Sequence, residues 1–104
     1  MNFGWLVDEE NSDRILDAAV EAGITTIDTA DIYSKWGDTS HAGKSEEIIG
    51  KWLKDRGVRD DIVLATKVRG DMSTNPNDVG LSRKHILESA KSSLVRLNLS
   101  LIHI

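Results

Sequence analysis

Two short apolar segments, each preceded and followed by a helical pattern, most constrain the fold of this chain. Residues 24–28, ITTID, are β-branched, and residues 61–67, DIVLATK, form a nearly continuous apolar run of strand length. Helices are expected over 12–22, from Ser45 onward and from Ser82 onward. Because strands that alternate with helices favour right-handed βαβ units, we predict an α/β protein with a parallel sheet.

The expected helices have recognisable ends and apolar stripes. Asn11 or Ser12 is placed to cap the first helix, which Gly23 is suited to end, while Ser45 and Ser82 are placed to cap the other two. The second and third helices are expected to bury Ile48, Ile49, Trp52 and Leu53, and Ile86, Leu87, Ala90, Leu94 and Leu97, respectively. In the strands, Ile24 and Ile27 are expected to be buried, and residues 61–67 to be covered on both faces.

The charge, the absence of cysteine and the absence of long apolar runs narrow the classes of function. Basic residues are scattered among acidic ones at a net charge of −4, so nucleic acid and anionic lipid are not expected partners. No apolar run reaches 18 residues and no signal-peptide pattern is present, which speaks against a membrane location. Without cysteine the chain suits a reducing compartment, so we expect a cytoplasmic protein.

Asp28 and Lys67 stand at the carboxyl ends of the two expected strands. Functional groups gather at that edge of α/β folds, and the two side chains meet there if the strand registers agree. Tyr33, five residues after Asp28, can reach the same place. A cationic lysine beside a phenol stabilises the phenolate, which makes the hydroxyl a better proton donor, while an aspartate holds the lysine charged. The alternative is a strand-end ion pair next to an unrelated tyrosine, and spacing leaves both open.

A second motif, GDTSHAGKS at 37–45, approximates a phosphate-binding loop. Gly37 and Gly43 enclose five residues where that loop needs four, and no strand directly precedes the segment. We therefore favour the start of a capped helix over nucleotide binding, which would depend on Lys44.

The histidines, aspartates and tryptophans outside this pattern give weaker signals. His41, His85 and His103 lie on different elements, so no metal site is predicted, and the first two are expected at the surface or in loops. Asp31 and Asp38 are expected to serve turns or caps. Trp5 and Trp36 lie in expected loops, where they are candidates for lining a substrate pocket, with simple packing an equal alternative.

Four segments resemble the N-terminal part of aldo-keto reductases. From Phe3 to Asn98 the chain contains D-T-A-x-x-Y, S-E-E-x-x-G, A-T-K and G-L-S-R-x-H in that family's order. The resemblance implies an NADPH-dependent oxidoreductase that reduces aldehydes or ketones in a (β/α)8 TIM barrel. This chain would supply the part from the end of the first strand to the third helix. In the implied Asp, Tyr, Lys and His tetrad, Tyr33 is the proton donor, Lys67 tunes it, and Asp28 charges the lysine and adjoins the cofactor.

The C-terminal end departs from the family pattern. His103 follows Leu97 by six residues, whereas the family's tetrad histidine follows by eleven, so His103 is not assigned that role. The last six residues, LSLIHI, match one reading frame of a widely used transposase sequencing-adapter end. We therefore expect residues 1–98 to be the N-terminal part of a barrel and residues 99–104 to be a non-native tail. The isolated chain is expected to be inactive, and the alternative function is a non-catalytic regulatory member or subunit of the same barrel family.

Overall fold

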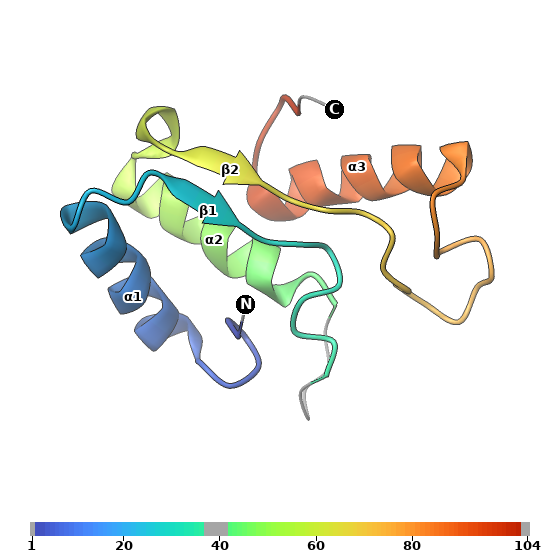
Figure 1. Cartoon of the computed structure of the whole chain (residues 1–104), viewed down its shortest axis with the longest axis horizontal. Helices are drawn as coiled ribbons and strands as arrows, with labels where there is room; N and C mark the ends of the chain where they lie inside the picture. The colour runs from blue at the N-terminus through green and yellow to red at the C-terminus, as the bar shows by residue number, and fades with distance from the viewer. Residues whose placement is uncertain (1, 37–41, 103–104) are drawn as a thin grey trace.

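The computed structural model describes residues 2–36 and 42–102. Its elements are α1 (Glu9–Glu21), β1 (Thr26–Asp28), α2 (Lys44–Arg56), the 3₁₀ helix η1 (Arg59–Asp61), β2 (Val63–Ala65) and α3 (Arg83–Leu97). The two strands are parallel neighbours, with Ile27 opposite Leu64 and Asp28 opposite Ala65. Figure 1 shows α2 running behind the strands, between α1 and α3. The predicted alternation of helices with parallel strands is confirmed.

The helices cover only one face of the two strands. Ile27 is buried, whereas its neighbours Thr26 and Asp28 are exposed, and in β2 Val63 is 64% exposed. The prediction that residues 61–67 are covered on both faces is therefore wrong. The prediction that Ile24 is buried is also wrong, because this residue precedes β1 in the connection from α1 and is 53% exposed.

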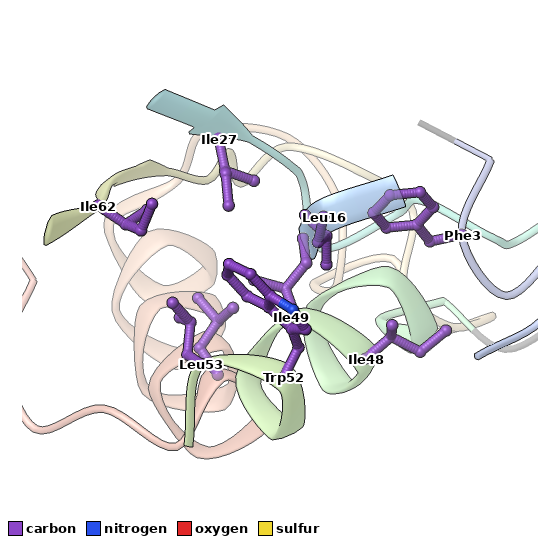
Figure 2. Packing of buried hydrophobic residues seen from close by; sticks show 9 residues of the cluster. Phe3, Leu16, Ile27, Ile48, Ile49, Trp52, Leu53 and Ile62 are labelled. Atoms are coloured by element: carbon purple, nitrogen blue, oxygen red, sulfur yellow. The ribbon is translucent and has the colours of Figure 1, made fainter. Parts of the chain in front are cut away.

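The core lies between the covered face of the strands and the helices. Figure 2 shows its side chains, which are Phe3, Leu16, Ile27, Ile48, Ile49, Trp52, Leu53, Ile62 and Leu97. Trp52 is 1% exposed, and its indole Nε1 donates to Asp17 Oδ1 over 2.8 Å, which satisfies the one polar atom of the ring. The predicted apolar stripe of α2 is confirmed.

The N-terminal ends of two helices differ from the predicted ones. Helix α1 begins earlier than expected because Asp8 is its cap: the Asp8 carboxylate accepts from the backbone N–H of Asn11, and two glutamates follow it in the first turn. Helix α2 begins after Gly43, at φ +91, and Ser45 lies inside the helix and bonds Thr29 instead. Ser82 caps α3 as predicted.

The buried face of α3 is more polar than predicted. His85, Ser89, Ser93 and Leu97 are buried, whereas Leu87 is 44% exposed. The last turn of α3 lies very close to α2: a Cβ added to Gly50 would be 2.5 Å from the backbone oxygen of Arg96. Of the residues predicted to be buried on α3, Leu97 is buried and Ile86, Ala90 and Leu94 are half-buried, so that prediction holds only in part.

Candidate functional site

The register of the two strands brings Asp28 and Lys67 together. Asp28 lies opposite Ala65, and Lys67 comes two residues later, so its side chain points to the same face of the sheet. Lys67 Nζ donates to Asp28 Oδ2 over 2.6 Å and to the carbonyl oxygen of Thr29 over 2.7 Å. The predicted meeting of these two side chains at the carboxyl ends of the strands is confirmed.

Tyr33 lies beside this pair. Lys67 Nζ is 5.1 Å from the centroid of the Tyr33 ring, and Tyr33 is partly buried while the side chains of Asp28 and Lys67 are 62% and 49% exposed. Burial acts to lower the pKa of Lys67, but its hydrogen bond to Asp28 and its contact with the Tyr33 phenol prevail and raise that pKa above its usual value. The lysine is therefore held as a cation next to the phenol.

The loop that carries Tyr33 is tied to the segment that carries Lys67. Beyond the strands, the backbone N–H of Thr29 donates to Ala65 O over 2.8 Å, and that of Asp31 donates to Lys67 O over 3.1 Å. These bonds extend the pairing past the last assigned residue of each strand. These hydrogen bonds hold the backbone between Asp28 and Tyr33. Both side chains are therefore kept at the carboxyl ends of the strands.

Trp5 and Trp36 form an exposed aromatic pair. Their ring centroids are 6.1 Å apart with planes tilted by 54°, and the two residues are 41% and 57% exposed. The segments that carry them are joined because Ser34, buried and at φ +82, donates its hydroxyl to the carbonyl oxygen of Phe3. Trp36 therefore lies on the turn that also carries Tyr33, and Trp5 contacts it there.

A buried polar cluster lies behind the site and was missed in the sequence. Glu46 is fully buried and accepts from Thr66 Oγ1 and from Arg96 Nε, each over 2.6 Å. Asp31, expected to serve a turn, is 1% exposed with one carboxylate oxygen lacking a partner, and burial, followed by the charge of Glu46, raises its pKa. In the sequence, Glu46 is one of two adjacent glutamates in the first turn of α2, a pattern typical of exposed acids that favour the helix dipole. Thr66, directly before Lys67, was the available signal.

The other residues considered in the sequence either lie away from the carboxyl ends of the strands or lie outside the described residues. His85 is 3% exposed on α3, with Ser89 Oγ 3.2 Å from its Nε2, so the prediction of a surface or loop histidine is wrong. The predictions for His41, Asp38 and His103 lie outside the described residues. Within 2–36 and 42–102, no three histidine, aspartate or glutamate side chains are grouped to hold a metal ion. Among the helices of the same ranges, none has both the length and the apolar composition to cross a membrane.

Relatives of known sequence share these segments. The chain is 49% identical over 71 residues to the "Uncharacterized 11.2 kDa protein in crtE 3'region" of Pseudescherichia vulneris, covering 67% of this chain and 69% of that protein. It is 46% identical over 102 residues to the "Uncharacterized oxidoreductase YrpG" of Bacillus subtilis, and 35% identical over 105 residues to the "Probable voltage-gated potassium channel subunit beta" of Oryza sativa. The matches cover 93% and 100% of this chain, respectively, and it spans only 30% of the length of either protein.

A solved structure and a family model agree with the fold described above. The holo form of the aldo-keto reductase AKR11C1 from Bacillus halodurans matches with a TM-score of 0.71 and 38% identity, over 91% of this chain and 30% of that one. The parallel strands and their helices are therefore part of a (β/α)8 barrel. A sequence model of the Aldo/keto reductase family matches residues 1–104. The chain belongs to the Aldo/keto reductase family.

Proposed function

We propose that Tyr33, Lys67 and Asp28 form the acid–base part of a site that reduces aldehydes or ketones to alcohols in the cytoplasm. One observation carries the proposal: Lys67 Nζ lies 2.6 Å from Asp28 Oδ2 and, at the same time, 5.1 Å from the centroid of the Tyr33 ring. This is the arrangement that a phenolic proton donor requires, because the phenol faces a cation that is itself held by a carboxylate.

The roles of the three side chains follow from their charges. As Tyr33 releases its proton to a carbonyl oxygen, negative charge develops on the phenol, and the ammonium of Lys67 stabilises it across the contact. Asp28 offsets the cost of holding that ammonium at a partly buried position. Transfer of the proton leaves the carbonyl carbon electrophilic.

NADPH is the reductant that we propose, and when bound it supplies hydride to the carbonyl carbon. At the carboxyl ends of the strands, the exposed carboxylate of Asp28 offers a hydrogen-bond acceptor and the ammonium of Lys67 offers a donor. This pair fits the polar nicotinamide end of such a cofactor. We assign Asp28 to the cofactor contact. Lys35 and Lys67 are each bonded to an aspartate, Asp71 and Asp28, so we assign neither lysine to the phosphates of the cofactor.

Trp5 and Trp36 are proposed as apolar walls of the substrate pocket. Their exposed, tilted rings present flat surface next to the turn of Tyr33, which suits an aromatic or alkyl substituent on the carbonyl.

A second candidate function is a non-catalytic subunit of the same barrel family. The observation in its favour is that matched relatives include a protein named as a potassium channel subunit beta. Such a protein would keep the barrel and bind the cofactor without turning over carbonyl compounds.

The test is NADPH oxidation with an aromatic aldehyde by the full-length protein that contains these residues. Tyr33→Phe removes the proton donor and should lower kcat by roughly 10²- to 10⁴-fold, the range contributed by a positioned acid. Lys35→Met is the control, because it removes a lysine that bonds Asp71 in the neighbouring loop, and it should leave kcat within about threefold. Full activity in Tyr33→Phe refutes the proposed acid, and tight NADPH binding without turnover in the unaltered protein supports the subunit.

A further inference from the structure

The first turn of α2 contacts the ends of both strands behind the proposed site. Ser45 Oγ lies 3.0 Å from Thr29 Oγ1, and Glu46 accepts from Thr66 Oγ1 over 2.6 Å. Thr29 directly follows Asp28 in the chain, and Thr66 directly precedes Lys67. One helical turn therefore bonds the neighbour of each member of the ion pair.

Glu46 is a rigid point of attachment. Its side chain is fully buried, and besides Thr66 it accepts a charge-assisted hydrogen bond of 2.6 Å from Arg96 Nε on α3. The Arg96 side chain is itself only 18% exposed, so neither partner has room to reorient in solvent. A buried carboxylate that loses a partner pays a large desolvation penalty, which keeps both bonds formed.

Thr66 transmits this position to Lys67 through the backbone. Adjacent residues of an extended segment point to opposite faces, so Thr66 reaches the helix side while Lys67 reaches the open side of the same edge. The lysine side chain is long and 49% exposed, and it is its terminal ammonium that bonds Asp28 and the carbonyl oxygen of Thr29. Its reach to Asp28 and Tyr33 therefore depends on where its Cα is placed.

We propose that Glu46 and Thr66 are positioning residues: the hydrogen bond from the Thr66 hydroxyl to the buried Glu46 carboxylate holds the strand end so that Lys67 reaches Asp28 and Tyr33 together. The catalytic part of this proposal rests on the proposed carbonyl reduction, whereas the placement of Lys67 does not.

The test uses a matched pair of variants in the full-length protein. Thr66→Val keeps the shape of the side chain and removes the hydroxyl, whereas Thr66→Ser keeps the hydroxyl and removes the methyl group. We expect Thr66→Val to lower kcat by roughly tenfold and to change KM by less than about twofold. Losses of this size are typical when a residue that orients an active-site side chain is removed. Thr66→Ser should stay within about twofold of the unaltered protein, and Thr66→Ala should behave as Thr66→Val does, which guards against a failure of the valine variant to fold.

Titration of Lys67 distinguishes positioning from a merely structural role. The side chain is followed by ¹³C NMR of its Cε, assigned with Lys67→Arg, in each variant at a temperature where it is folded. We expect the Lys67 pKa to fall toward its ordinary value in Thr66→Val and to stay raised in Thr66→Ser. When Asp28→Asn is already present, adding Thr66→Val should shift the Lys67 pKa by less than half as much as it does alone. The reason is that the Asp28 carboxylate, which Lys67 would lose as a partner, is then absent.

The outcomes separate the two proposals. If Thr66→Val matches Thr66→Ser in kcat and in the Lys67 titration, the positioning role is wrong, whatever happens in Tyr33→Phe. Suppose instead that neither the unaltered protein nor any variant reduces carbonyl compounds while Thr66→Val still shifts the Lys67 pKa. In that case the positioning role stands and the proposed reaction is wrong.

Discussion

Replacing Gly50 with alanine should force α2 and α3 apart. The added Cβ would lie 2.5 Å from the backbone oxygen of Arg96 and 2.7 Å from both the carbonyl carbon and the Cα of Leu97. All three are backbone atoms, so no side-chain rotation relieves the overlap and one helix has to move. Overpacking of this kind costs about 1–3 kcal/mol of stability. Because three backbone atoms are involved, we expect the cost of Gly50→Ala to lie at the upper end of this range. Alanine recovers roughly 1 kcal/mol of helix propensity, which leaves a net loss of about 2 kcal/mol.

Urea unfolding followed by tryptophan fluorescence measures this loss. Trp52 is 1% exposed in the core and reports its opening. With a slope of about 2 kcal/mol per molar urea, a loss of about 2 kcal/mol lowers the unfolding midpoint by about 1 M. The separation should also weaken the bond between Glu46 and Arg96, since Arg96 lies on the segment that is displaced.

Gly57→Ala is the matched control. Gly57 follows α2 at φ +64, and a Cβ there meets no atom within 4 Å, so its cost comes only from the left-handed backbone, about 1 kcal/mol. An unfolding midpoint for Gly50→Ala equal to or above that of the unaltered protein would show that the two helices do not approach as described. So would a larger loss in Gly57→Ala than in Gly50→Ala.

Three further changes test the buried acid, the aromatic pair and the C-terminal residues. Burial and then Glu46 raise the pKa of Asp31 above 3.8, so its contribution to stability is complete below pH 3.8 and is lost as the pH rises through the folded-state pKa. Asp31→Asn should therefore raise the free energy of unfolding at pH 7 by on the order of 1 kcal/mol and flatten its pH dependence, and a loss of stability at pH 7 would contradict the assignment. Trp36→Ala should raise KM for an aromatic aldehyde about tenfold with kcat little changed, whereas an unchanged KM would remove Trp36 from the pocket. Sequencing the gene across the Asn98 codon should show a continuation other than LSLIHI, and genomic DNA that encodes the same six residues would establish them as native.

Local patterns in the sequence were sufficient to identify the helices and strands and the end of β1 at Asp28, whereas β2 ends at Ala65, two residues before the predicted Lys67. The β-branched and apolar runs marked the positions of β1 and β2, and the helical spacing of Ile48, Ile49 and Trp52 identified the buried stripe of α2. Ser82 was recognisable as a cap because the groups it bonds lie within one turn of it. The family motifs singled out Asp28, Tyr33 and Lys67 as a candidate set, whose catalytic roles stay a prediction.

The tertiary structure decided how these residues meet and what lies behind them. The register that sets Asp28 opposite Ala65 determines that Lys67 reaches the carboxylate, and it depends on contacts between segments almost 40 residues apart. The same holds for the burial of Glu46 and for the buried face of α3, where Ser89 and Ser93 are buried and the predicted Leu87 is not. The spacing of apolar residues along a helix or strand indicates which side of it is apolar. It does not indicate which segment from elsewhere in the chain packs against that side. Only packing shows that the backbone of α3 comes so close to Gly50 that a Cβ does not fit there.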